Sequence, residues 1–239
     1  MSMFISTNVS SLNAQRHLTN SSKSLDTSYT RLASGLRINS AKDDAAGLQI
    51  SSRMTSQING LDQGNRNAND GISMAQTAEG AMDEVTSMLQ RIRTLAQQSA
   101  NDTNTDDDRA ALQKEVGALQ KEITRIGSDT TFAGTNLFAA DKTYKFQVGA
   151  DTAQVISIDL KKMDAAALGV DGFDIKDETG AQDALSKVDD VIKTVDGYRA
   201  DLGAVQNRLD STIRNQANIS ENVSAARSRI RDADFATET

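Results

Sequence analysis

The sequence predicts a mainly α-helical protein, an elongated bundle of long antiparallel helices resembling a coiled-coil rod, with one small β-hairpin. Three observations predict this fold class. Proline is absent from all 239 residues, and proline breaks helix interiors at a cost of ~3 kcal/mol. Apolar residues recur every seven positions through most of 183–234, and they alternate with polar residues only within 143–160.

Residues 1–36 are expected to form a weak amphipathic helix. Its flanks are rich in Ser, Thr and Asn, which are poor helix formers, so the segment needs a partner helix to become ordered. A plain surface helix is the alternative. Residues 37–43 interrupt the pattern, and Ser40 is a candidate N-cap for the next helix. The candidate subunit-packing stripe of this first helix consists of Phe4, Leu18, Leu25, Tyr29, Leu32 and Leu36.

Two further helices are expected at about 44–99 and 106–127. The apolar stripe of the first drifts around the helix, which indicates contact with more than one neighbour. Each interior glycine costs ~1 kcal/mol relative to alanine, so repeated glycines favour close backbone approach. Thr105 and the following aspartates are typical of a capped helix start rather than a calcium loop. The glycines in question are Gly47, Gly60, Gly64, Gly71 and Gly80.

The apolar period then changes from helix to strand. Two runs with alternating apolar residues, separated by a turn that begins at Gly149, predict a β-hairpin at about 143–160. Its single apolar face requires packing against the helices. Residues 161–180 are expected to form a short irregular connector.

A long helix at 183–234 carries two apolar tracks with coiled-coil spacing. Such a stripe requires partner helices, which are expected at 44–99 and 106–127. Polar Thr212 and Gln216 mark the places where this seam is weakest, or where it faces something other than its own core. The expected rod core comprises Leu89, Ile92, Leu112, Val116, Leu119, Ile123, Val195, Leu202, Leu209, Val223 and Ile230.

Composition excludes several functional classes. A formal net charge of -7 argues against a nucleic-acid partner, and no apolar run approaches the ~18 residues of a membrane span. The N-terminus has no Sec-type signal pattern. Cysteine is absent, and the single histidine, His17, has no neighbouring ligand set, so no enzyme activity, metal or cofactor is expected.

Four stretches resemble bacterial flagellin. They are 32–47 (LASGLRINSAKDDAAG), 65–73 (NRNANDGIS), 89–96 (LQRIRTLA) and 229–236 (RIRDADFA). The resemblance implies a structural subunit of the flagellar filament that assembles with other flagellin subunits into an extracellular helical tube for swimming. It also implies flagellar type III export, an export chaperone and a filament cap protein as partners.

The resemblance further implies a division of the chain. Residues 1–43 correspond to the inner-tube helix and its linker, and 44–239 to the rod domain. Residues 161–180 stand where flagellins carry variable outer domains, so this is a minimal form. The family continues beyond the Asp-Ala-Asp-Phe motif for another helix, whereas this chain stops at Thr239. We expect truncation, and we expect this version alone to be defective in filament assembly.

The resemblance also implies a receptor contact. The vertebrate Toll-like receptor that senses flagellin uses an Arg, Leu and Glu cluster on the rod, which here matches Arg91, Leu95 and Glu115. An ordinary solvated helix face is the alternative. For the whole chain, the alternatives to a filament subunit are a flagellar hook–filament junction protein and a soluble helical binding module or secreted effector.

Overall fold

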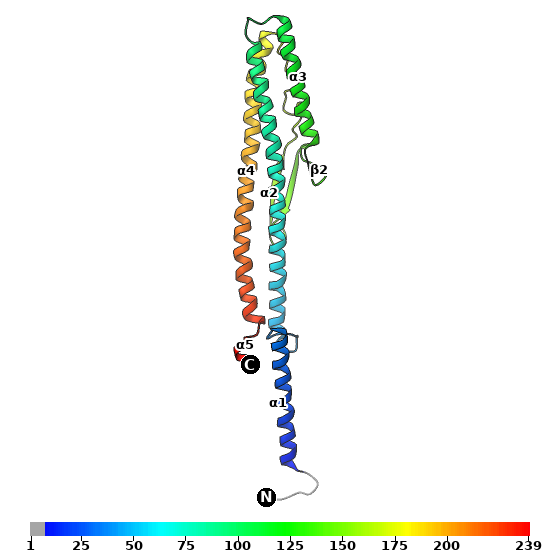
Figure 1. The fold of residues 1–239 in the computed structure, drawn as a ribbon, viewed down its shortest axis with the longest axis vertical. Coiled ribbons are helices and arrows are strands. Elements are labelled where there is room, and N and C mark those ends of the chain that lie inside the picture. The colour runs from blue at the N-terminus through cyan, green and yellow to red at the C-terminus, as the bar shows by residue number, and fades with distance from the viewer. Residues whose placement is uncertain (1–7) are drawn as a thin grey trace. The chain divides into compact units, whose positions relative to one another are not determined.

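The computed structural model describes residues 8–239 and divides into two compact units. One unit comprises Asp62–Gln216, and the other comprises Met1–Leu61 with Ala217–Thr239. We call them the hairpin unit and the terminal unit. The long helices α2 (Ala45–Ser99) and α4 (Glu178–Arg231) contribute residues to both (Figure 1).

In the hairpin unit, α2 and α4 run antiparallel, side by side (Figure 1). Their register is marked by polar pairs on one side. Arg93 Nε donates to Asp189 Oδ1 at 2.6 Å, and Arg199 Nη2 lies 2.9 Å from Asp83 Oδ1. The apolar side of both helices forms the core together with α3 (Asp106–Asp129) and the hairpin. The predicted fold class of long helices with little sheet is confirmed.

The start of α3 is a capping box, as the sequence indicated. The Thr105 hydroxyl accepts from the Asp108 backbone N–H, and the Asp108 carboxylate accepts from the backbone N–H and the hydroxyl of Thr105. These hydrogen bonds, that from the Thr105 hydroxyl first, hold the pKa of Asp108 below its ordinary value. The aspartates here therefore serve the helix end.

The hairpin consists of β3 (Lys142–Gln147) and β4 (Val155–Leu160), paired from Lys142↔Leu160 to Gln147↔Val155. Ile156, Ile158 and Leu160 are buried on its inner face. A second, very short hairpin was not expected from the sequence. It joins β1 (Thr131–Phe132) to β2 (Thr135–Asn136) through a tight turn that is too short to show strand periodicity.

The connector after β4 is irregular, as expected, and it packs closely on the rest of the unit. Val170 and Ile175 are buried, and the segment lies along α3. Gln113 bonds twice to it: its amide nitrogen donates to the Phe173 carbonyl at 3.0 Å, and its oxygen accepts from the Ile175 N–H at 2.7 Å. Gln120 donates to the Val170 carbonyl. Side chains of α3 thus replace the hydrogen bonds that regular secondary structure would supply.

The terminal unit contains α1 (Val9–Ser34), the ends of α2 and α4 that belong to it, and a short helix, α5 (Phe235–Glu238). Asp44, not Ser40, caps α2, because the Asp44 carboxylate accepts from the Gly47 N–H at 2.9 Å. Helix α4 begins at Glu178, before the expected start at 183. It ends at Arg231 rather than 234, because the next residue, Asp232, pairs with Leu36 in a β-bridge and Asp234 caps α5.

Candidate packing surface

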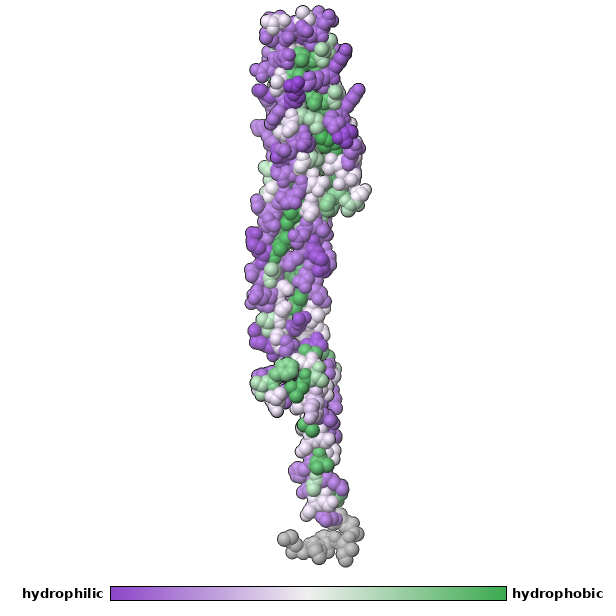
Figure 2. Space-filling view, in the orientation of Figure 1, coloured by the Kyte–Doolittle hydropathy of each residue, from purple (hydrophilic) through white to green (hydrophobic). Residues whose placement is uncertain are grey.

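Helix α1 exposes its apolar residues. Leu18 is 75% exposed, Leu25 56% and Tyr29 63%, and none of the residues of α1 is buried. Leu32 and Leu36 are half-buried, whereas Phe4 lies outside the described residues. The apolar surface of the α1 segment appears green in the lower part of Figure 2. Of the predicted packing stripe, Leu18, Leu25 and Tyr29 thus form an uncovered apolar surface in this structure.

Val9 and Leu12 are exposed as well, at 62% and 50%, and the sequence reasoning missed both. With 3.6 residues per turn, Val9 lies on the side of α1 opposite Leu18, and Leu12 lies between the two sides. They lie outside the seven-residue tracks through Leu18 and Tyr29, because Ser11 and Asn8 occupy the corresponding earlier positions. Counting i, i+3 neighbours at the start of the helix, instead of a strict heptad, would have found them.

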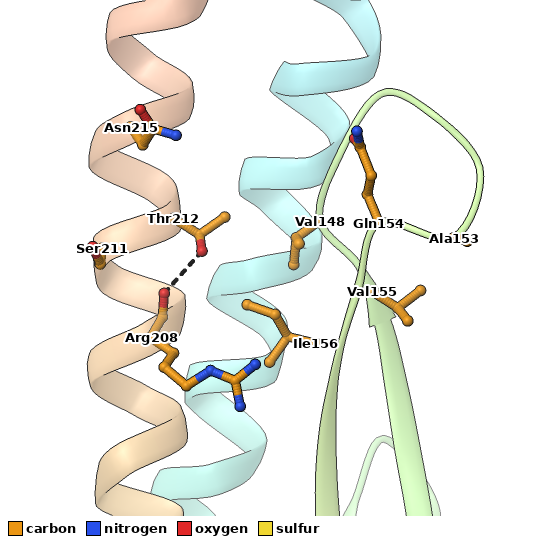
Figure 3. Close-up of a pocket in the computed structure, with 9 residues that line it drawn as sticks. All are labelled: Val148, Ala153, Gln154, Val155, Ile156, Arg208, Ser211, Thr212 and Asn215. Carbon is orange, nitrogen blue, oxygen red and sulfur yellow. Dashed lines mark hydrogen bonds between the residues drawn. The ribbon is translucent and has the colours of Figure 1, made fainter.

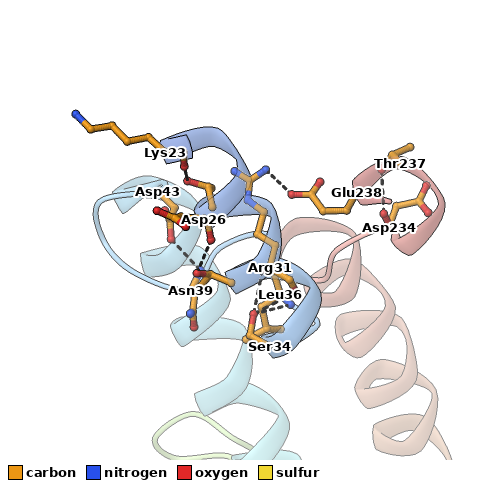
Figure 4. Close-up of polar contacts among 12 residues, drawn as sticks. Lys23, Asp26, Arg31, Ser34, Leu36, Asn39, Asp43, Asp234, Thr237 and Glu238 are labelled. Carbon is orange, nitrogen blue, oxygen red and sulfur yellow. Dashed lines mark hydrogen bonds and ion pairs between the residues drawn. The ribbon is translucent and has the colours of Figure 1, made fainter. Parts of the chain in front are cut away.

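The end of α1 is fixed by contacts to the C-terminal part of the chain (Figure 4). Gly35 takes a left-handed backbone (φ 69°), and its N–H donates to the Arg31 carbonyl, which closes the helix. Leu36 forms a β-bridge with Asp232. Arg31 Nη1 lies 3.0 Å from Glu238 Oε1 of α5. The last turn of α1 is therefore held in place while its apolar face remains uncovered.

The loop after α1 is closed by a carboxylate. Asp43 accepts from the Ser40 N–H at 2.8 Å, from the Ser40 hydroxyl at 3.0 Å and from the Asn39 N–H at 3.1 Å. These bonds, the Ser40 N–H first, lower the pKa of Asp43 from its ordinary value. Inside the loop, Ile38 is buried and occupies the space beside Gly47, where a methyl group would lie 2.6 Å from it.

The residues expected to form the rod core are all at least partly buried. Leu89, Ile92, Val116, Ile123, Val195, Leu202 and Leu209 are buried, and Leu112 and Leu119 are half-buried against them. Val223 and Ile230 belong to the terminal unit and are half-buried there. Gln216, on the same track, is 5% exposed.

The candidate receptor cluster divides between surface and core. Arg91 and Glu115 form an exposed ion pair, with Nη2 and Oε1 2.6 Å apart and the two side chains 52% and 43% exposed. Leu95 is only 1% exposed, because its side chain points into the core of the hairpin unit. Its placement does not fit a direct receptor contact, since sequence similarity alone does not tell which face of a helix a residue occupies.

An open groove lies between the hairpin and α4 (Figure 3). Its volume is about 680 Å³. Figure 3 shows hairpin residues on one side and α4 residues on the other, with the Thr212 hydroxyl donating to the Arg208 carbonyl at 2.9 Å. It is lined by Val148, Ala153, Gln154, Val155, Ile156, Arg208, Ser211, Thr212 and Asn215.

Two features of residues 8–239 bear on other functions. No group of three or more His, Cys, Asp or Glu side chains there could hold a metal ion. None of the helices in that range is both long and apolar enough to cross a membrane.

Comparisons with known proteins give consistent matches. Residues 5–143 match the family model described as the bacterial flagellin N-terminal helical region, and 185–239 match the C-terminal helical region. A flagellin of Halalkalibacterium halodurans is 49% identical over 240 residues, which covers 99% of this chain and 88% of that protein. Flagellin E of Vibrio cholerae is 36% identical over 345 residues, which covers 100% of this chain and 91% of that protein.

Solved structures agree. The crystal structure of Bacillus cereus flagellin matches with a TM-score of 0.54 and 30% identity, over 63% of this chain and 88% of that one. A putative flagellar hook-associated protein from Vibrio parahaemolyticus matches with a TM-score of 0.67 over 80% of this chain and 100% of that one. Its identity is 16%, so this second likeness concerns the fold alone.

Proposed function

The chain belongs to the bacterial flagellin family, and we propose that it assembles through the exposed apolar face of α1. As a flagellin, it is a structural subunit of the extracellular flagellar filament and not an enzyme. The observation that carries this function is 49% identity to a flagellin over 99% of the chain. The relative from Vibrio cholerae aligns over 345 positions, so it carries residues for which this small form has no counterpart.

The assembly proposal rests on the exposed apolar residues of α1. Fully burying one leucine-sized side chain contributes roughly 1.5–3 kcal/mol, so covering Leu18, Leu25 and Tyr29 strongly favours association with other helices. The α1 helices of neighbouring subunits would pack against one another and line the inner tube. The division into an inner segment, 1–43, and a rod, 44–239, belongs to this proposal.

Seeded polymerisation tests it. Fragments of flagellar filament would be mixed with the chain, and elongation would be followed by electron microscopy. Leu18→Asp should abolish incorporation, because a carboxylate would be buried in an apolar contact. Asn20→Asp places the same charge on the opposite side of α1 and should permit incorporation. Equal incorporation of both variants would show that the α1 face is not the contact.

A hook–filament junction protein is the alternative role suggested by the sequence. The TM-score of 0.67 to a putative hook-associated protein does not favour it, because at 16% identity that likeness concerns the fold alone. The identities of 30% and 49% to flagellins favour the filament role instead. Long tubes in the polymerisation experiment would support the filament subunit, and short terminal caps the junction protein.

Further partners follow from the same proposal. The chain would pass through the flagellar type III channel with the help of an export chaperone, and a filament cap protein would receive it at the filament tip. Loss of its secretion in cells that lack the flagellar export apparatus would test this route.

A vertebrate flagellin-sensing Toll-like receptor would contact the exposed Arg91–Glu115 pair, with the buried Leu95 supporting the helix beneath it.

A further inference from the structure

Gln216 is a polar residue in an apolar seam. It occupies the track of α4 on which Val195, Leu202 and Leu209 are buried, and it is itself only 5% exposed. An apolar side chain here would extend the seam and strengthen the packing of α4 on α2. Gln216 must therefore be explained by what its amide contacts.

That amide holds the backbone of the hairpin. Gln216 Nε2 donates to the Val148 carbonyl. The neighbouring carbonyl, that of Gln147, accepts from Asn67 Nδ2 on α2 at 2.8 Å. Gly64, one turn before Asn67, leaves room for the Val148 carbonyl, since a methyl group on Gly64 would overlap it. Two consecutive carbonyls are thus held by side-chain amides from two different helices, an arrangement that we call the carbonyl clamp.

The clamp grips the hairpin at its tip. Pairing of β3 with β4 ends at Gln147↔Val155, so Gln147 and Val148 are where the strand passes into the turn. At this point the Val148 and Gly149 N–H groups both donate to the Gln154 carbonyl. The hairpin unit begins at Asp62 and ends at Gln216, so the clamp uses the parts of α2 and α4 that lie at the boundary of this unit.

Holding the hairpin in this way leaves another polar atom of Gln216 without a partner. The Gln216 side-chain oxygen is buried without a hydrogen-bond donor among residues 8–239, and a buried unsatisfied acceptor costs about 1–3 kcal/mol. Replacing Gln216 by an apolar residue of similar shape would remove this unsatisfied oxygen but would leave the Val148 carbonyl without its donor, so the two effects on stability oppose each other. The cost is explained if the position of the hairpin matters more than the strength of the seam.

We propose that Gln216 is a positioning residue, which with Asn67 fixes the hairpin tip against α2 and α4 and so sets the wall of the groove beside α4. Val148, which the clamp holds, lines that groove together with Thr212 and Asn215 of α4 (Figure 3). The consequence for assembly rests on the proposed filament function: repeated subunits pack equivalently only if each presents the hairpin in the same place.

Hydrogen exchange separates positioning from stability. In Gln216→Leu, the amides of Val148 and Gly149 should exchange roughly tenfold faster, the loss expected for one hydrogen bond. The melting temperature should change little, because the lost bond to Val148 and the removed unsatisfied oxygen offset each other. The matched control is Gln206→Leu, which removes a glutamine of α4 that bonds to Glu79 instead of the hairpin. This control should leave exchange at the hairpin tip unchanged.

Other outcomes would overturn the proposal. Unchanged tip exchange in Gln216→Leu would show that the clamp does not hold the hairpin. A lower melting temperature with faster exchange throughout the unit, or failure of the variant to fold, would make Gln216 an ordinary stabilising residue. Asn67→Leu supplies an independent arm, because it removes the other half of the clamp and should also accelerate exchange at the tip.

The assembly experiment uses the same variants. Gln216→Leu should elongate filament seeds several-fold more slowly than Gln206→Leu, and equal rates would overturn the assembly consequence. If the unsubstituted chain itself does not elongate seeds, the proposal of assembly through α1 fails, while the exchange experiment still decides whether the clamp positions the hairpin.

Discussion

Gly64 of α2 lies in direct contact with the carbonyl oxygen of Val148, at the end of β3. The helix backbone and the strand backbone meet there with no side chain between them. Gln216 Oε1 lies beside this contact, 3.3 Å from the position that a Gly64 methyl carbon would occupy. The glycine therefore lets the hairpin approach closely enough for its carbonyl to reach an amide on α4.

Gly64→Ala should destabilise the hairpin unit. The added methyl group cannot be accommodated by a rotamer change, because the atom that it meets belongs to the backbone. Overpacking of this kind costs about 1–3 kcal/mol. Urea unfolding followed by circular dichroism would measure the loss.

Gly80→Ala is the matched control in the same helix. No atom lies within 4 Å of a methyl group built on Gly80, and alanine is the better helix former by about 1 kcal/mol. This variant should therefore gain about 0.5–1 kcal/mol. If both alanine variants shift stability in the same direction, close approach at Gly64 is not what distinguishes the two positions.

The glycines of α2 show which part of the packing could be predicted from the sequence and which could not. The frequency of glycine in α2 indicated close backbone approach, and this holds for Gly64, which meets the Val148 backbone. Gly71 faces side chains instead, since its methyl group would lie 3.3 Å from side-chain atoms of Leu209 and Phe146. Close backbone approach does not occur at Gly80 either. Composition counts glycines, but it does not say which of them face a neighbouring backbone.

The connector marks a different limit. Helices and the main hairpin were predictable because buried side chains recur with a fixed period. The connector shows no such periodic pattern of buried side chains. Its backbone is held by hydrogen bonds from Gln113 and Gln120, which lie far away in the sequence and leave no periodic signal. Leu95 is a third case. Sequence similarity assigned it to the exposed receptor-contact cluster, whereas its side chain is buried in the core of the hairpin unit.

Gln113→Ala should destabilise the protein by about 1–3 kcal/mol, since it leaves the Phe173 carbonyl and the Ile175 N–H without partners. The measurement is again urea unfolding. Lys121→Ala, an exposed position on the same helix, should change stability by less than about 0.5 kcal/mol. A Gln113→Ala loss no larger than that of Lys121→Ala would mean that the connector is held by its apolar residues alone.

Asp43 should make stability depend on pH in the acid range. Hydrogen bonds from Ser40 and Asn39 lower its pKa in the folded state below the ordinary value of 3.8. Its contribution is therefore complete above that value and is lost as the pH falls through the lower folded pKa. Asp43→Asn should reduce stability at neutral pH and remove part of the acid dependence. A titration midpoint of the Asp43 carboxyl at or above 3.8, measured by NMR, would contradict this.

Arg91→Ala should weaken signalling through a flagellin-sensing Toll-like receptor while leaving the fold intact. The Arg91–Glu115 pair is exposed, and exposed pairs contribute only about 0–1 kcal/mol to stability, so a large loss of signalling would reflect a lost contact. The control is Arg125→Ala, which removes an exposed arginine of α3 that is likewise paired with a glutamate, Glu122. Reporter-cell activation by purified chains of matched thermal stability would measure the effect. If the two variants activate the receptor equally well, Arg91 is an ordinary solvated cation and the receptor contact lies elsewhere.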